Sequence, residues 1–320
     1  MSPDPSSKGA QMSVNLAGRV AVVTGSGRGL GAAYARQLAN AGAAVVVNDV
    51  SDEAAAATVD AIRAAGGTAT ALVAPVGETA VAEALVETAV SEFGGLDALV
   101  TNAGILRDRS LLKMTDDDFD DVIRVHLRGT FTCVRAAYGS FRERNVPGRI
   151  IAIGSPTGQR GNFGQTNYAA AKAGIVGMIR TWALEMSRAG VTANAVIPVA
   201  ATEMTRTVPY FAAAVEAQDA GVAMPDFFRK DLGFGSADDV AGLIVYLASA
   251  ESDGITGQVI GIGGDRLQLW SHPEPVLSAV HAGGWSPQDI AAEFGPRLRA
   301  QLQSVGEEFP ELPAEFVREA

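Results

Sequence analysis

The chain has 320 residues, a formal net charge of -11 at pH 7 and one cysteine, Cys133. The negative charge argues against nucleic acid or an anionic membrane as a partner, because either would require a basic face. A single cysteine excludes an intrachain disulfide and a cysteine metal cluster, and no apolar run reaches the roughly 18 to 20 residues of a membrane span. We therefore expect a cytoplasmic protein without a metal site, with a flexible polar leader over residues 1–15.

Short β-branched runs alternate with longer alanine-rich runs from residue 19 onward. The short runs are almost continuously apolar, which is typical of parallel strands covered on both faces. The predicted strands are 19–24, 43–49, 68–73, 96–101, 149–154, 191–197 and 258–262. The predicted helices between them lie near 29–41, 53–65, 78–93, 116–144, 164–189 and 236–250. This alternation predicts a single α/β domain of the Rossmann type, with a doubly wound, seven-stranded parallel sheet.

Two regions interrupt the alternation. Residues 199–235 form a long insertion before the last predicted helix. Loops that leave the carboxyl ends of parallel strands build the ligand site, so we expect this insertion to be a substrate loop. Residues 265–320 contain Trp270, Trp285 and a helical run near 287–304. This composition indicates a C-terminal extension that packs against protein surface and lies outside the domain.

A glycine-rich turn joins the first predicted strand to the first predicted helix. Its glycines permit a tight turn and a close approach of a ligand to the backbone, and the helix N-terminus offers N–H groups that bind phosphate. Asp49 ends the second predicted strand, where a carboxylate accepts hydrogen bonds from an adenosine ribose. We therefore predict a dinucleotide site. The contacts expected from the turn are Gly25, Gly27, Arg28, Gly29, Leu30 and Gly31.

Tyr168 and Lys172 are four residues apart in a predicted helix, so they lie on one helix face. An ammonium near a phenol favours the phenolate and lowers the phenol pKa from about 10. Tyr168 could then accept a proton near neutral pH, which is a catalytic property. Taken alone, however, this stretch favours a surface tyrosine beside a solvated lysine, and only the rest of the chain can decide for catalysis.

The motifs together resemble the short-chain dehydrogenase/reductase family over roughly residues 16–264. The matching motifs are Thr24-Gly25-(x)3-Gly29-x-Gly31, Asn102-Ala103-Gly104, Ser155 and Tyr168-(x)3-Lys172. The resemblance implies that Tyr168 exchanges a proton with the substrate alcohol or carbonyl, while Ser155 hydrogen-bonds the substrate oxygen. It also implies that Lys172 lowers the tyrosine pKa and holds the nicotinamide ribose. The Asn-Ala-Gly motif, Tyr168 and Lys172 are therefore expected to contact the cofactor.

Four segments resemble more closely the (3R)-hydroxyacyl-CoA dehydrogenase part of type 2 multifunctional enzymes. They are "VVVNDV" (45–50), "NAGILRDRSL" (102–111), "RVHLRGTF" (124–131) and "GNFGQTNYAAAK" (161–172). Those relatives oxidise 3-hydroxyacyl-CoA with NAD, and some accept hydroxysteroids. The chain carries no hydratase or sterol-carrier module, so it resembles a stand-alone bacterial member.

Some positions depart from the family pattern. His126 occupies the helix position of a catalytic-relay asparagine, where it either lines the relay or packs as a helix residue. Val76 replaces an aspartate beside the adenine. Pro198 is followed by valine in place of glycine near the nicotinamide, where Ala201 is the last expected cofactor contact.

The sequence favours an NAD-dependent oxidoreductase that interconverts a secondary alcohol and a ketone on a 3-hydroxyacyl-CoA or steroid-derived substrate. One alternative is a carbonyl reductase of another hydrophobic ketone, such as a free steroid. Another is a nucleotide-binding regulatory protein without turnover.

Cofactor choice depends on two residues with opposite preferences. Arg28 suits the 2′-phosphate of NADP, whereas the Asp49 carboxylate repels it, and like charges in close contact cost several kcal/mol. Arg28 can turn to solvent, so we expect NAD. The family resemblance and the alanine-rich helices 116–144 and 164–189 further predict a homodimer or homotetramer.

Overall fold

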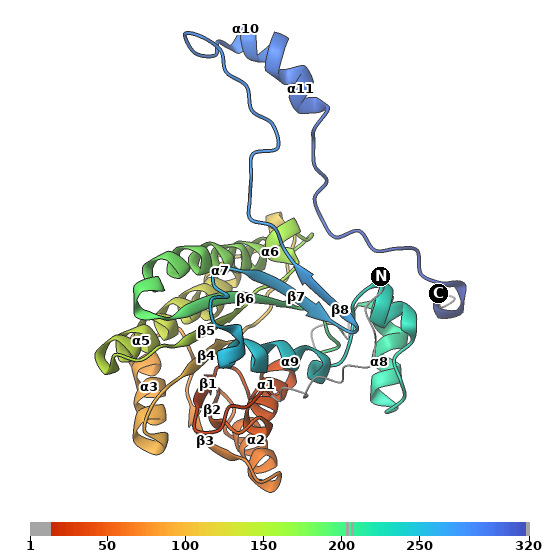
Figure 1. The fold of residues 1–320 in the computed structure, drawn as a ribbon. Helices are drawn as coiled ribbons and strands as arrows, with labels where there is room; N and C mark the ends of the chain where they lie inside the picture. Colours follow the sequence, from red (N-terminus) through yellow and green to blue (C-terminus); the bar gives the residue numbers. More distant parts are fainter. Residues whose placement is uncertain (1–13, 203–204, 206–207, 318–320) are drawn as a thin grey trace, which may run out of the picture.

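An eight-stranded sheet forms the centre of the structure, in the strand order β3-β2-β1-β4-β5-β6-β7-β8 (Figure 1). The computed structural model describes residues 14–202, 205 and 208–317, so nearly all of the expected leader lies outside the described residues. The parallel strands are β1 (Val20–Val23), β2 (Ala44–Asp49), β3 (Thr68–Val73), β4 (Ala98–Thr101), β5 (Arg149–Ile153), β6 (Thr192–Pro198) and β7 (Val259–Gly263). The order reverses at β1, so the predicted Rossmann-type topology is confirmed.

The predicted count of seven strands is wrong, because β8 (Arg266–Leu269) extends the sheet beyond β7. β8 runs antiparallel and pairs Leu267 with Ile262. Gly264, with a φ of 51°, and Asp265 form the two-residue connection. Glycine at the first position is typical of tight hairpin turns. The turn signal was therefore present in the sequence, at the start of the region assigned to the C-terminal extension.

Helices cover both faces of the sheet and bury two separate apolar cores. One face carries α1 (Gly29–Asn40), α2 (Asp52–Ala64) and α9 (Ala237–Ala248). The other face carries α3 (Thr79–Phe93), α5 (Gly129–Arg144) and α7 (Thr166–Glu185). Within β2, Val45 and Val47 point into the first core and Val46 into the second. Burial on both faces explains why the strands are almost continuously apolar.

The predicted helix 116–144 consists of three consecutive pieces. α4 (Asp116–Val122) begins at Thr115, whose hydroxyl accepts a hydrogen bond from the Asp118 N–H, while the Asp118 carboxylate accepts one from the Thr115 N–H. This capping box accounts for the acidic start of the helix. A π-helical turn, Ile123–Arg128, then leads into α5. Such turns occur frequently at functional sites, and this one contains His126.

Residues 199–235 form a small aromatic core of their own. Phe211 stacks on Phe234 with ring centroids 4.3 Å apart. Leu312 and Phe316, from the end of the chain, pack against this core, so the predicted substrate loop and the C-terminal extension are joined. The elements here are the 3-10 turn Pro209–Phe211, α8 (Ala212–Asp219), the π-helical turn Phe227–Asp231 and the 3-10 turn Ala314–Phe316.

Between β8 and that last turn, the chain runs away from the sheet and returns, as the blue segment at the top of Figure 1 shows. Its helical tip consists of α10 (Pro287–Asp289), the π-helical turn Ile290–Phe294 and α11 (Gly295–Arg299). The remaining short elements are Leu111–Lys113, α6 (Thr157–Arg160), Ser187–Ala189 and Ala250–Ser252. Among the described helices, none combines the length and the apolar character needed to cross a membrane.

Candidate active site

A cavity of about 770 Å³ opens at the carboxyl ends of the central strands, where strand order reverses. This is the place where doubly wound sheets bind their ligands. The sequence-predicted residues that line it are Gly25, Arg28, Gly29, Leu30, Gly31, Asp49, Val76, Asn102, Ala103, Gly104, His126, Ser155, Tyr168, Lys172 and Pro198. Gly27 and Ala201 do not line it. The fold therefore brings the predicted dinucleotide residues and the predicted proton-transfer residues into one space.

Two positions in the glycine turn, Gly25 and Gly31, have no room for a side chain. Gly25 has a φ of 60°, and a Cβ on it would lie 2.6 Å from the Ala103 Cα. A Cβ on Gly31 would lie 2.1 Å from the Gly25 carbonyl oxygen. Side chains are therefore excluded, and the N-terminus of α1 faces the cavity. This cradle suits a phosphate group, which backbone N–H groups and the helix dipole both attract.

Asn102 holds the turn in place through its side chain. Its Nδ2 donates to the carbonyl oxygens of Thr24 and Gly25, at 3.1 and 2.8 Å. The Thr24 hydroxyl in return accepts from the backbone N–H groups of Asn102 and Ala103, at 3.0 and 3.1 Å. The amide of Asn102 is thus engaged with the protein backbone, and its contribution to ligand binding is to fix the shape of the cradle.

Asp49 lies at the corner where an adenosine ribose would be recognised. One carboxylate oxygen accepts from the Gly27 N–H at 3.0 Å and the other from the Ser51 N–H at 3.1 Å. These bonds orient the carboxylate, and a Cβ on Gly27 would lie 2.8 Å from it. Gly27 therefore acts through Asp49, which explains why it does not line the cavity itself.

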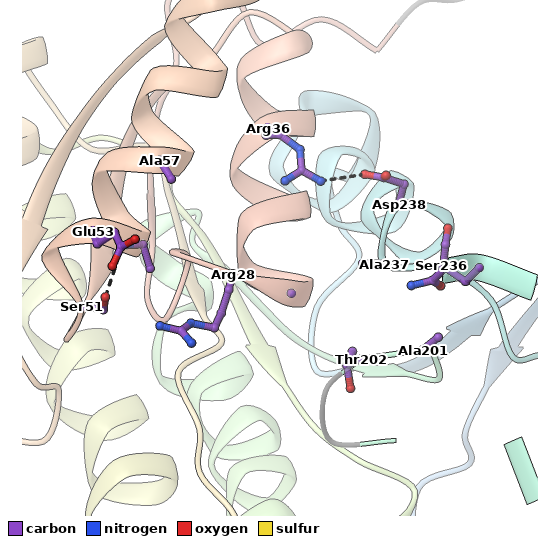
Figure 2. Close-up of a pocket in the computed structure, with 13 residues that line it drawn as sticks. Arg28, Arg36, Ser51, Glu53, Ala57, Ala201, Thr202, Ser236, Ala237 and Asp238 are labelled. Atoms are coloured by element: carbon purple, nitrogen blue, oxygen red, sulfur yellow. Dashed lines mark hydrogen bonds and ion pairs between the residues drawn. The ribbon is translucent and has the colours of Figure 1, made fainter. Parts of the chain in front are cut away.

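A second cavity of about 760 Å³ adjoins this corner, at the N-terminal ends of α1, α2 and α9. Figure 2 shows Arg28 turned toward the start of α2, and Arg36 directed at Asp238, with which it forms an ion pair at 3.4 Å. Among the described residues, the Arg28 side chain makes no hydrogen bond or ion pair, and Arg28 borders both cavities. Ala201 lines this second cavity.

Tyr168 and Lys172 project from the first turns of α7 into the main cavity. The Lys172 Nζ donates to the Ile153 carbonyl oxygen at 2.7 Å and lies 5.5 Å from the centroid of the Tyr168 ring. The Tyr168 phenol is hydrogen-bonded to Ser155. Asn167 fixes the start of the helix, since its Nδ2 donates to the Arg107 and Asp118 carbonyl oxygens at 3.1 and 2.9 Å.

The expected lowering of the Tyr168 pKa is not found in this arrangement. Burial raises the pKa of Tyr168, although the hydrogen bond from Ser155 opposes the rise. Burial also lowers the pKa of Lys172 to about 7. Both changes have one cause, because a site removed from water penalises the charged form of each group. In the protein by itself, the phenol and the lysine are therefore both biased toward their neutral forms.

His126 is buried behind Tyr168, and its ring meets the tyrosine ring edge-on with centroids 5.1 Å apart. Its Nε2 lies 3.0 Å from the Ile105 nitrogen and 2.8 Å from the Ile105 oxygen. Burial and the nearby Lys172 lower the His126 pKa to about 3, so the imidazole is neutral. A Cβ on Gly104 would lie 2.3 Å from the imidazole Cε1, which explains the glycine there.

Sequence reasoning expected one wall of the cavity only as a loop, residues 199–235, and missed the part that comes from the end of the chain. This wall is apolar and comes from the substrate loop and the C-terminal extension. Its large apolar residues are Val208, Phe211, Leu232, Phe234 and Phe309. Glu307 also lines it, and partial burial raises the pKa of its carboxyl. No spacing rule links residue 309 to residue 211, so the sequence alone offered no signal for this contact.

The fold and the site define a nucleotide-binding dehydrogenase of the doubly wound α/β class. The family model described as short chain dehydrogenase matches residues 19–211, more than half of the chain. The protein therefore belongs to the short-chain dehydrogenase family, and it is an oxidoreductase of alcohols or ketones that uses a nicotinamide nucleotide.

Similar proteins agree with the closer resemblance predicted from the sequence. A hydroxyacyl-CoA dehydrogenase of Mycobacterium tuberculosis is 40% identical over 296 residues, which cover 87% of this chain and 88% of that protein. The peroxisomal multifunctional enzyme type 2 of Drosophila melanogaster is 47% identical over 200 residues, covering 60% of this chain and 33% of the enzyme. The chain thus matches a third of that enzyme's length. A short chain dehydrogenase from Mycobacterium avium has a similar structure, with a TM-score of 0.76 and 36% identity over 92% of this chain and 98% of that one.

Proposed function

We propose that the protein oxidises a secondary alcohol to a ketone with NAD, on a 3-hydroxyacyl-CoA or a steroid-derived substrate. The observation that carries this proposal is the single cavity in which Ser155, Tyr168 and Lys172 meet both the glycine turn and an apolar wall. The reverse reaction, reduction of a hydrophobic ketone, uses the same groups. The nicotinamide supplies or accepts the hydride.

The proton is handled by Tyr168. In the oxidation the phenolate takes the hydroxyl proton, and in the reduction the phenol donates a proton to the carbonyl oxygen. Ser155, which is hydrogen-bonded to the phenol, is positioned to hydrogen-bond the same substrate oxygen. The protonated Lys172 side chain stabilises the phenolate. Because the Lys172 pKa is about 7, this side chain can gain and lose its proton near neutral pH.

His126 is proposed to extend this proton path. Its neutral imidazole packs against Tyr168, and within the described residues its Nδ1 has no hydrogen-bond partner although it is buried. Because Nε2 lies against the Ile105 backbone, Nδ1 is the ring nitrogen left to take a hydrogen bond in the relay, which is the role that the resemblance implies for the asparagine at this position. Because the His126 pKa is about 3, it acts through hydrogen bonds and not as a charged group.

The residues present fit a dinucleotide. The side-chain-free cradle at Gly25 and Gly31 suits the pyrophosphate, and the oriented carboxylate of Asp49 suits a ribose that has free hydroxyls. We propose NAD over NADP because both Asp49 oxygens keep acceptor capacity toward hydroxyls, whereas a 2′-phosphate would be repelled. Arg28 borders the adjoining cavity and is free to turn away from the ribose.

The apolar wall supports a hydrophobic acyl chain or ring system as the substrate. Glu307 adds a constraint, because its carboxylate disfavours a free carboxylic acid in the same cavity. A thioester or a neutral steroid avoids that repulsion. The Mycobacterium tuberculosis relative is a hydroxyacyl-CoA dehydrogenase by name, which favours the acyl-CoA, and we therefore place it first among the substrates.

NADH formation tests the proposal directly. The protein is incubated with NAD or NADP and with 3-hydroxyacyl-CoA thioesters of increasing chain length, the matching free acids, and hydroxysteroids. We expect turnover with NAD and thioesters, and little with the free acids. Turnover of free steroids alone would favour the carbonyl-reductase alternative, while nucleotide binding without any turnover would favour the regulatory alternative. We also propose a homodimer or homotetramer, built partly from the helices near 116–144 and 164–189. The cytoplasmic location stays a prediction.

A further inference from the structure

Residues 271–305, here called the arm, are tied to the body at both ends. Before the arm, the Trp270 N–H donates to the Val259 carbonyl oxygen at 2.9 Å. After it, Gly306 and Arg160 exchange two hydrogen bonds, from the Gly306 N–H to the Arg160 oxygen at 2.7 Å and from the Arg160 Nε to the Gly306 oxygen at 2.8 Å. Between these ties the arm leads away from the sheet and back (Figure 1). Its position is therefore set by the fold, while its middle stands clear of the body.

The tip of the arm is folded on itself. Trp285 lies between His281 and Phe294, with ring centroids 5.1 and 5.9 Å away. Ser286 and Asp289 form a capping box, and the Arg297 guanidinium donates to the Ser278 carbonyl oxygen. Such a segment has a definite shape to present to a partner.

The arm nevertheless exposes many large apolar side chains. Val280 is 98% exposed and Leu302 is 72% exposed, and Val276, Ile290, Leu298 and Val305 are exposed as well. A segment of this size cannot bury enough apolar surface alone to be stable, and units below about 40 residues usually need a partner surface. The arm thus has a shape but lacks the contact that would stabilise it.

A second unpartnered apolar surface lies at the rim of the main cavity. It consists of Leu111, Leu112 and Phe163, here called the rim patch, of which Leu112 is 99% exposed and Phe163 is 90% exposed. The two loops that carry these residues are joined, since the Arg109 N–H donates to the Gly164 carbonyl oxygen at 2.9 Å. Clustered apolar groups on a rigid surface mark an interaction site.

We propose that the arm of one copy of the protein covers the rim patch of a second copy. The arm carries three acidic and two arginine residues, so it is almost neutral in a chain of net charge -11, and it can approach another copy with little repulsion. In a two-fold dimer each copy gives an arm and receives one, which covers both exposed surfaces at once. The arm does not cover the patch of its own chain, since Leu112 and Phe163 remain 99% and 90% exposed while the arm leads away from the body (Figure 1).

Matched variants test the two surfaces separately. Ile290→Asp with Leu298→Asp alters the arm, Leu112→Asp with Phe163→Asp alters the rim patch, and Val90→Asp with Val222→Asp is the control on other exposed apolar positions. Sedimentation velocity over a concentration series measures the association. We expect the arm and patch variants each to weaken dimer formation at least tenfold, and the control to associate as the wild type does. Equal association in all four proteins would overturn the proposal.

Cross-linking separates a second copy from the same copy. Cys133 is buried and does not compete with introduced thiols. A tagged Phe163→Cys chain is mixed with an untagged Leu298→Cys chain and oxidised, and the Phe163→Cys/Leu298→Cys chain is oxidised alone. A disulfide between tagged and untagged chains is the expected result. A disulfide formed only within one chain of the double variant, or none in either experiment, contradicts the proposal. Neither result depends on turnover, so the proposed function is tested independently.

Discussion

The two sides of the cavity are held by different kinds of contact. On the cofactor side, Asn102 hydrogen-bonds the backbone of Thr24 and Gly25. On the substrate side, Phe309 contacts Tyr210 and Phe211 through aromatic rings, 5.0 and 5.6 Å between centroids. The first side comes from loops that directly follow neighbouring strands, and the second joins segments about a hundred residues apart. We therefore expect the two sides to respond separately to mutation.

The largest effect is expected where the two sides meet. Tyr168→Phe keeps the ring against His126 but removes the exchangeable proton, and such acid–base contributions are worth roughly 10²–10⁴ in rate. We expect kcat to fall by that factor, while the Kd for NADH, measured by fluorescence, stays within about twofold. Tyr138→Phe, on α5 and outside the cavity, is the control. A variant that keeps most of its activity would remove Tyr168 from the proton transfer.

The next largest effect is expected on cofactor choice. Asp49→Ser removes the charge that opposes a 2′-phosphate and leaves Arg28 in place. We expect the ratio of kcat/KM for NAD to that for NADP to fall by about tenfold to hundredfold, since like-charge contact costs several kcal/mol. The KM for the alcohol should hardly move. A wild-type preference for NADP would show that Arg28 outweighs Asp49.

Asn102→Ala should act on the cofactor side alone. It leaves the Thr24 and Gly25 carbonyl oxygens without their donor, and an unsatisfied buried polar group costs about 1–3 kcal/mol. We expect a lower free energy of unfolding and an increase of about tenfold in the KM for the cofactor. Urea unfolding and steady-state kinetics measure the two quantities. An equal rise in the KM for the alcohol would contradict the separation of the two sides.

Phe309→Ala should act on the substrate side alone. It removes the contacts with Tyr210 and Phe211, and aromatic pairs contribute about 0.5–1.5 kcal/mol each beyond their burial. We expect the KM for a long-chain substrate to rise about five- to tenfold, with the KM for the cofactor unchanged. Val280→Ala, on the exposed arm, is the control. An unchanged substrate KM would show that this wall does not touch the substrate.

The smallest effect concerns stability and pH. The Lys172 pKa is about 7 in the folded protein and near 10.5 in the unfolded chain, so folding carries the full cost of a buried charge at and below pH 7. That cost declines as the pH rises from 7 toward 10.5. Lys172→Met should therefore raise Tm most at pH 6 to 7, with the gain shrinking at pH 9. A gain that grows with pH would contradict the burial of this ammonium.

The sequence predicted most of the cofactor side because its motifs are short and follow strands. The glycine turn, Asp49 and the Asn-Ala-Gly motif each have a local spacing rule, and all lie at the ends of strands that the apolar runs identify. The substrate side was predicted only as a loop. Phe309 reaches the substrate side through tertiary contacts, and such contacts produce no periodic pattern in the sequence from which they could be predicted.

The charge states were also beyond a sequence argument. The four-residue spacing correctly placed Lys172 beside Tyr168, but it does not show whether the two side chains are exposed to water or buried. Burial, which depends on the whole surrounding fold, reversed the expected direction of the tyrosine pKa. Similarly, the strand β8 was missed because Asp265 and all residues after it were assigned to an extension outside the sheet.

The π-helical turn at Ile123–Arg128 makes the position of His126 depend on the number of residues in that turn. Such a turn holds one residue more than an α-helix of the same extent. Deleting a residue there would restore regular α-helical turns, and α4 and α5 would keep their register because the π-helical turn had absorbed the extra residue; only residues within the turn, His126 included, would be re-aimed. The imidazole would then leave its place behind Tyr168 with every neighbouring side chain intact. A single-codon deletion in this turn would thus displace the imidazole without changing any of the residues that contact it.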